Sequence, residues 1–241
     1  MSKTVASAML MAGEELATAL DKLNFTSPVA VTYNTFAFAW EGYRAYLEKF
    51  VSGNRRILFL GMNPGPWGMV QTGIPFGEVS IVRDWMELNP DIHQPEPVHP
   101  KRPVKGMQCE RSEVSGKRLW GLFVERFKKP QNFFNDHIVL NYCPLAFMEK
   151  TGRNLTPDKL PASETRSLQV VCDDHLRTVV AALQPDWVIG VGVYAEKRAR
   201  EALDSKGLRF GRILHPSPAN PHANAGWAER ATTQMQELGA W

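Results

Sequence analysis

The stretch Arg56–Leu60 (RILFL), followed by Gly61–Met69 (GMNPGPWGM), decides the fold class of this 241-residue chain. An unbroken apolar run of this length is typical of a strand that is buried on both faces of a parallel sheet. Three glycines and two prolines between Gly61 and Gly68 then impose a stiff, irregular loop. Ligands of such sheets bind beyond the carboxyl ends of the strands, so this loop is a candidate site. It lacks the G-x-G-x-x-G spacing of a dinucleotide-binding loop.

Three further apolar runs have the same character, namely His137–Asn141 (HIVLN), Asp186–Val191 (DWVIGV) and Arg209–Leu214 (RFGRIL). Helical spacing of apolar residues predicts helices between and around them, at Ala6–Leu23, Ser112–Lys128, Ser163–Leu183, Tyr194–Leu203 and Ala223–Leu238. The alternation predicts an α/β fold, a three-layer α/β/α sandwich around a central, mainly parallel four-stranded sheet. We expect one domain over residues 1–241, with the proline-rich stretch Asn89–Pro103 as an irregular surface loop.

Composition excludes several classes of protein. Hydrophobic residues are 44% and charged residues 22% of the chain, which argues against disorder and collagen-like structure. No run reaches the ~18–20 apolar residues of a membrane span. The apolar stretch Val5–Ala12 is followed by Glu14 and Glu15, which indicates an amphipathic helix rather than a signal peptide. We therefore expect no membrane association, and a place in the cytoplasm or nucleoid of a bacterium or in the nucleus of a eukaryote.

The three cysteines, Cys109, Cys143 and Cys172, are odd in number and widely spaced. This pattern predicts neither a disulfide framework nor a zinc or iron–sulfur site, so we expect small buried side chains and no metal. The net charge is 28 − 25 = +3, but Lys101–Pro130 alone carries nine Lys or Arg against three Glu. A second basic run holds Lys197, Arg198, Arg200, Lys206, Arg209 and Arg212. Both runs fit either a solvated face or contact with a phosphate backbone.

Polar residues stand where the predicted strands end. Asn63 and Asn141 follow the first two runs, and His215 opens the loop HPSPANPHAN after the fourth. Each has a structural interpretation as a turn, strand-end or buried residue, and a functional one as a group held rigidly at the mouth of the sheet. Phe76, between Pro75 and Gly77, is either a core residue or a platform for a planar ligand. Ser217 lacks a G-x-S-x-G context, so a serine hydrolase is not predicted.

Three blocks carry a family resemblance: Gly61–Val79 (GMNPGPWGMVQTGIPFGEV), Asn141–Pro157 (NYCPLAFMEKTGRNLTP) and His215–Trp227 (HPSPANPHANAGW). In sequence and order they resemble the signature blocks of the single-strand-selective monofunctional uracil-DNA glycosylase family. The resemblance implies the α/β/α sandwich of the uracil-DNA glycosylase superfamily. It also implies that the chain hydrolyses the N-glycosidic bond of uracil and 5-modified uracils such as 5-hydroxymethyluracil, in single- and double-stranded DNA, and leaves an abasic site.

The resemblance assigns roles to matching positions. Asn63 would position the hydrolytic water, and His215 would assist departure of the base. Met62 and Gly65 would line the base pocket, Phe76 would stack on the flipped base, and Asn141 would pair with the uracil edge. Pro216, Ser217, Pro218, Ala219, Asn220 and Pro221 would belong to the wedge that enters DNA. Gly65 would leave room for a water beside a polar 5-substituent.

These residue types suit the reaction. Departure of uracil places negative charge on O2, so a histidine donor there stabilises the transition state selectively. Uracil presents a donor at N3 and an acceptor at O4, whereas cytosine reverses both, so a fixed amide distinguishes them. The base must leave the stack before it can react, and wedged side chains offset part of that cost. We expect uracil-containing or otherwise damaged DNA as partner, free base as product, no cofactor and a monomer.

Alternatives remain at this stage: a preference for deaminated purines such as xanthine, or a non-catalytic protein that binds damaged or single-stranded DNA. The chain also departs from the family pattern. Trp67 replaces a phenylalanine of vertebrate members, and Ala219, His222 and Ala225 stand where Arg, Gln and Lys are frequent. The basic run Lys101–Lys129 is expected to compensate for the missing charges.

Overall fold

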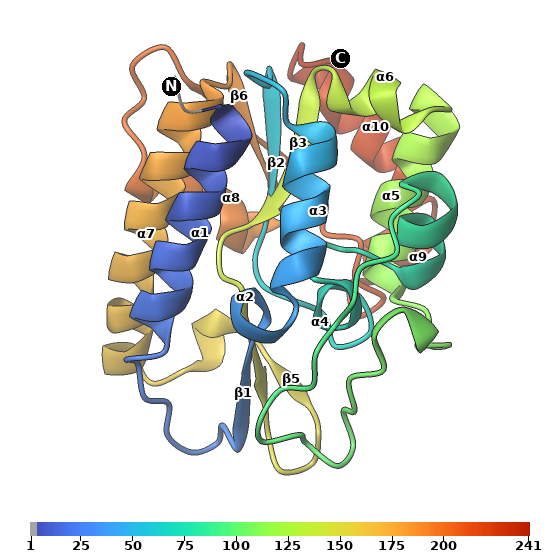
Figure 1. Cartoon of the computed structure of the whole chain (residues 1–241). Helices are drawn as coiled ribbons and strands as arrows, with labels where there is room; N and C mark the ends of the chain where they lie inside the picture. The colour runs from blue at the N-terminus through green and yellow to red at the C-terminus, as the bar shows by residue number, and fades with distance from the viewer. Residues whose placement is uncertain (1–3) are drawn as a thin grey trace.

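The computed structural model describes residues 4–241, so residues 1–3 of the expected domain lie outside it. Its central sheet has four parallel strands in the order β3-β2-β6-β7 (Figure 1). The strands are β2 (Ile57–Gly61), β3 (His137–Asn141), β6 (Trp187–Val191) and β7 (Arg209–Ile213). Each lies within one residue of its predicted run. Strands β2, β3 and β6 are buried almost throughout, as their unbroken apolar character requires.

Helices cover both faces of this sheet and confirm the predicted sandwich (Figure 1). One layer contains α1 (Val5–Leu20), α3 (Trp40–Phe50), α7 (Ala162–Leu183) and α8 (Val193–Ala202). The other contains α5 (Val114–Phe127), α6 (Pro130–Phe134) and α10 (Trp227–Glu237). Short helices complete the chain: α2 (Thr35–Phe38), α4 (Met69–Thr72), α9 (Pro221–Asn224), the π-helix η1 (Ile81–Trp85), and the 3-10 helices η2 (Gly106–Gln108) and η3 (Pro157–Lys159).

Two predicted helices differ from the observed ones. The expected helix Ala223–Leu238 is wrong as a single element, because Gly226 adopts a left-handed φ of 74° and separates α9 from α10. The expected helix Ala6–Leu23 ends three residues early, at Leu20. Helix α3 has no counterpart among the expected elements, although its buried residues, Tyr43, Tyr46, Leu47 and Phe50, follow helical spacing.

A second, antiparallel sheet was also not expected. It consists of β1 (Val31–Asn34), β4 (Leu145–Met148) and β5 (Asn154–Leu155), in the order β1-β4-β5. Strand β4 begins four residues after the end of β3, so the chain passes from one sheet to the other immediately beyond Asn141. The second sheet therefore forms part of the wall at the carboxyl end of the central strands.

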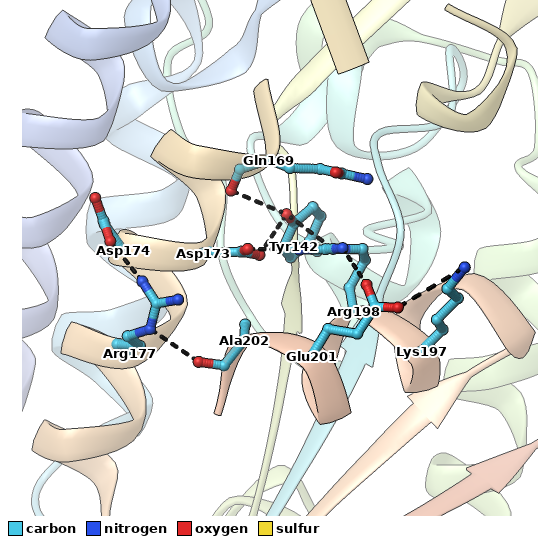
Figure 2. Close-up of polar contacts among 9 residues, drawn as sticks. All are labelled: Tyr142, Gln169, Asp173, Asp174, Arg177, Lys197, Arg198, Glu201 and Ala202. Atoms are coloured by element: carbon cyan, nitrogen blue, oxygen red, sulfur yellow. Dashed lines mark hydrogen bonds and ion pairs between the residues drawn. The ribbon is translucent and has the colours of Figure 1, made fainter. Parts of the chain in front are cut away.

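A buried polar cluster fixes this crossing point (Figure 2). The hydroxyl of Tyr142, next to Asn141, donates to Asp173 of α7 at 2.6 Å. Arg198 of α8 pairs with the same carboxylate at 2.5 Å and donates to the Tyr142 hydroxyl at 3.2 Å. Glu201 contacts the other side of the Arg198 guanidinium. Helices α7 and α8 are thus joined to the residue that follows β3.

Two other expectations of the sequence, on the cysteines and on the proline-rich stretch, are confirmed. Cys109, Cys143 and Cys172 are free and buried. Residues 89–103 contain neither helix nor strand. Among the described residues, no helix combines the length and the apolar character needed to cross a membrane.

Candidate active site

A cavity of about 310 Å³ opens beyond the carboxyl ends of β2, β3 and β7. All six residues expected to carry catalysis and base binding line it: Met62, Asn63, Gly65, Phe76, Asn141 and His215. They come from three segments far apart in sequence. Their convergence follows from the parallel sheet, in which the carboxyl ends of strands lie at one edge. Gly61 and Asn141 are register partners of β2 and β3, which places the two loops side by side.

Asn63 is held by β4. Its Nδ2 donates to the carbonyl oxygen of Leu145 at 3.2 Å. This contact, rather than a turn within its own loop, fixes the side chain. Since the amide nitrogen is engaged, the amide oxygen is the atom left to accept a hydrogen bond from a water molecule in the cavity.

Asn141 presents an unpaired acceptor to the cavity. Its Nδ2 donates to Sδ of Met69 at 3.2 Å, whereas its Oδ1 is buried and has no hydrogen-bond partner among residues 4–241. The side chain therefore does not close the strand end through backbone bonds. A buried, unpartnered amide oxygen costs roughly 1–3 kcal/mol, a penalty that a ligand with a matching N–H removes.

Phe76 combines both interpretations offered by the sequence, because its half-buried ring packs against the core and also lines the cavity. Its φ of 55° is unusual for a non-glycine residue. Two close approaches hold it. A Cβ on Gly61 would lie 2.4 Å from the Phe76 ring and 2.2 Å from Asn141 Oδ1, and a Cβ on Gly116 would lie 2.1 Å from the Phe76 carbonyl oxygen.

His215 is a neutral hydrogen-bond donor. Its Nδ1 accepts the backbone N–H of Ser217 at 3.1 Å, so the ring proton is on Nε2. Burial lowers the pKa of His215 to about 4, because desolvation disfavours the imidazolium. The ring centroid lies 6.1 Å from that of Phe76, on the wall of the same cavity.

The loop after His215 has a buried base and an exposed tip. Pro216 is buried and Ser217 lines the cavity, whereas Pro218, Ala219 and Pro221 are exposed. Asn220 caps α9 by accepting the backbone N–H of His222 at 3.1 Å. Of the segment expected to form the wedge, residues 218–221 make up the tip, and Pro216 and Ser217 make up the base.

Arg118 of α5 ties both ends of this loop, donating to the Pro216 carbonyl and to Asn224 Oδ1, each at 3.0 Å. Glu113 and Ser115 near the start of α5, and Asn154 and Thr156 at β5, also line the cavity. Sequence analysis assigned none of these residues a role in the site, although Arg118 lies in the first basic run and Asn154 and Thr156 lie in the second family block. The only signal for Glu113 was its place at a helix start, which by itself indicates a cap.

The two basic runs differ sharply in their environment. In the second, Lys197, Arg198, Arg200, Arg209 and Arg212 all pair with acidic side chains. In the first, none of the nine Lys and Arg between residues 101 and 130 forms an ion pair with an acidic group of the described chain. Arg102 and Arg111 of this run lie over the Trp67 ring, 5.1 and 4.6 Å from its centroid. Positive charge available to a polyanion is thus concentrated in residues 101–130.

Comparison with known proteins identifies the family and the fold. The family model described as the uracil DNA glycosylase superfamily matches residues 48–236. The single-strand selective monofunctional uracil-DNA glycosylase of Rattus norvegicus is 48% identical over 222 residues, covering 91% of this chain and 80% of the relative. The same glycosylase of Bos taurus is 47% identical over 222 residues, covering 91% of this chain and 82% of the relative. The wild-type SMUG2 crystal structure from Pedobacter heparinus shares the fold, with a TM-score of 0.67 and 17% identity over 95% of this chain and 97% of that chain.

Proposed function

The chain belongs to the single-strand selective monofunctional uracil-DNA glycosylases of the uracil-DNA glycosylase superfamily, and we propose that its cavity holds a uracil base flipped out of DNA. It is accordingly a hydrolase of base excision repair that breaks the N-glycosidic bond and leaves the DNA strand intact. The observation that carries the assignment of the site is the meeting of an unpaired buried acceptor, Asn141 Oδ1, with a neutral donor, His215 Nε2, in one cavity.

Asn141 selects the base. In the bound state its Oδ1 accepts N3–H of uracil, and its Nδ2 donates a hydrogen bond to O4. In cytosine, N3 is an acceptor and would face the Oδ1 acceptor, and the 4-amino group is a donor and would face the Nδ2 donor. Each buried group left unpaired in this way costs roughly 1–3 kcal/mol. Phe76 stacks on the face of the base, since the close approach of Gly61 confines its ring and that of Gly116 confines its backbone.

His215 and Asn63 carry the chemistry. As the glycosidic bond breaks, negative charge gathers on O2 of the base, and the Nε2–H of His215 stabilises it without transferring its own proton. Asn63 orients a water by accepting a hydrogen bond from it at Oδ1, and the water oxygen attacks C1′ of the oxocarbenium-like sugar. The attacking water then loses a proton to solvent. No lysine lines the cavity in the described chain, so the enzyme has no amine there to form a Schiff base.

Several finer points belong to the same proposal. The accepted bases include 5-modified uracils such as 5-hydroxymethyluracil, in single and double strands. DNA lies along the unpaired basic run 101–130, and the tip 218–221 occupies the space that the base leaves. The protein acts as a monomer with a single domain over residues 1–241, and it releases the free base. It works where the chromosome lies, which is the cytoplasm and nucleoid of a bacterium or the nucleus of a eukaryote.

Base release from labelled oligonucleotides that carry one uracil tests this function. The strands are single or double, EDTA is present, and alkali afterwards cleaves abasic sites. Wild-type protein is expected to give cleavage only after alkali. Asn63→Ala and His215→Ala are each expected to lose roughly 10²–10³ in rate. Asn24→Ala and His93→Ala, at exposed positions outside the cavity, are matched controls that retain wild-type rates.

Three results would contradict the proposal. The first is intact uracil with DNA binding retained, which favours the binding-protein alternative. The second is strand cleavage without alkali together with a borohydride-trapped adduct. The third is DNA binding that does not weaken with salt, because contact with phosphates releases counterions.

A further inference from the structure

Glu113 fills the space that a side chain at Gly65 would occupy. It stands immediately before α5, and its Oε2 accepts the backbone N–H of Trp67 at 3.2 Å. A Cβ on Gly65 would lie 2.4 Å from Oε2, and one on Gly68 would lie 2.9 Å from Cγ of Glu113. The Glu113 side chain thus packs against the loop after β2, and it also lines the base cavity.

The orientation of Asn141 tells which edge of the base faces this carboxylate. The donor end of the Asn141 amide, which meets O4, lies against Met69. The turn that contains Met69 returns to Gly65, because the Val70 amide donates to the Gly65 carbonyl at 3.3 Å. His215, which meets O2, lies in the loop after a different strand, β7. In a pyrimidine C5 follows C4 on the side away from O2, so C5 points toward Gly65 and Glu113.

We propose that Glu113 is a specificity residue of this site, whose carboxylate accepts a hydrogen bond from a hydroxyl group on the C5 substituent of the base. The inference rests on the proposed function, because it takes the bound base to be a uracil. It assigns the recognition of a donor-bearing substituent, such as 5-hydroxymethyl, to one side chain outside the three signature segments.

The surroundings of Glu113 make it a strong acceptor for a group that can donate. Burial raises the pKa of its carboxyl, and the backbone amides of Trp67, Ser115 and Gly68 together with the charge of Arg102 offset this only in part. A carboxylate that has lost much of its water gains from each donor that reaches it. A methyl group at C5, as in thymine, would shield the same carboxylate from water but would give it no hydrogen bond. A site built to bond a hydroxyl rejects such an analogue, since its polar group is left unpaired.

The test compares two substituents of nearly equal size. Single-turnover release of 5-hydroxymethyluracil and of 5-ethyluracil is measured on the same single-stranded oligonucleotide, with uracil itself as a third substrate. The readout is the ratio of the hydroxymethyl rate to the ethyl rate. Because Glu113 also holds the Trp67 amide, its replacement slows all substrates, and the ratio removes this common effect.

Wild-type protein is expected to favour the hydroxymethyl base, and Glu113→Gln to reduce the ratio roughly 10- to 100-fold, the usual worth of a hydrogen bond to a charged group. Glu110→Gln makes the same chemical change at an exposed position three residues earlier and keeps the wild-type ratio. If Glu113→Gln does not fold, Glu113→Asp takes its place, since it keeps the charge but shortens the side chain by one methylene, and it is likewise expected to lower the ratio.

The outcomes separate the two proposals. Wild-type protein that releases uracil, but whose ratio is near one or is unchanged by Glu113→Gln, overturns the role of Glu113 and leaves the glycosylase function in place. Wild-type protein that releases no uracil and neither substituted base overturns both.

Discussion

The backbone amide of Ser217 donates to Nδ1 of His215 at 3.1 Å, across the first turn of the loop that follows β7. This single bond determines the tautomer of the ring. With Nδ1 used as an acceptor, the proton of the neutral imidazole is on Nε2, the atom free to face the base. Burial supports the same state by lowering the pKa of His215 to about 4. The site therefore has its donor in place without having to bind a proton from solvent.

The pH dependence of the reaction checks this arrangement. The folded pKa of His215, about 4, lies below the ordinary value of 6.5, so the ring stays neutral as the pH falls from 8 to 5. We expect the single-turnover rate to show no step from His215 over this range. NMR of labelled His215 should show the Nε2–H tautomer throughout. A titration of His215 near pH 6.5, with a parallel change in rate, would contradict the neutral-donor mechanism.

Gly61→Ala is expected to abolish most activity with a smaller effect on stability. The added Cβ meets both Asn141 Oδ1 and the Phe76 ring at less than 3 Å, so two recognition groups must move together. We expect a loss of at least about 100-fold in uracil release and a destabilisation of roughly 1–3 kcal/mol, typical of overpacking. Gly121→Ala is the control, because nothing lies within 4 Å of its Cβ position in α5. Release within threefold of wild type in Gly61→Ala would show that the two side chains are not held as described.

The polar cluster beside Asn141 offers a matched pair of adjacent aspartates (Figure 2). Asp173 pairs with buried Arg198, whereas Asp174 pairs with Arg177 on the exposed face of α7 at 2.5 Å. Asp173→Asn leaves the buried guanidinium with the half-exposed Glu201 as its remaining acidic partner and is expected to lower the free energy of unfolding by up to about 3–5 kcal/mol. Asp174→Asn should cost no more than about 1 kcal/mol. Urea denaturation measures both, and equal costs would refute the structural role of the buried pair.

Features set by the local sequence pattern could be predicted, whereas features that depend on contacts between residues far apart in the chain could not. The four central strands were predictable because a strand covered on both faces must be apolar throughout. The meeting of Asn63, Asn141 and His215 at one edge followed from these strands, since parallel strands bring their carboxyl ends together, whereas the expected roles of the three residues rested on the family resemblance. Strands β1 and β4 have only four residues each and no alternation to mark them. Glu113 could not be predicted, because its function depends on two glycines more than forty residues away that leave room for its carboxylate.

Arg118 gives a last prediction that depends on contacts nearly a hundred residues apart. Its guanidinium joins the Pro216 carbonyl to Asn224 Oδ1, so it holds the two ends of the loop that carries the proposed wedge. Arg118→Ala is expected to raise KM for uracil-containing duplex roughly 3- to 10-fold, since the loop must then be ordered on binding. Arg118→Lys should restore little, because one ammonium group lacks the planar fork that spans both acceptors.

Lys117→Ala separates this tether from simple attraction to phosphate. Lys117 is the neighbouring residue, exposed and of equal charge, with no ion pair among the described residues. If either residue binds a phosphate, its removal lowers the slope of log K against log salt concentration by about one, because one counterion fewer is released on binding. Removing the tether instead weakens binding equally at all salt concentrations. We therefore expect Arg118→Ala to keep the wild-type salt slope while its affinity falls. A reduced slope in Arg118→Ala would instead make Arg118 a phosphate ligand and contradict its role as a tether alone.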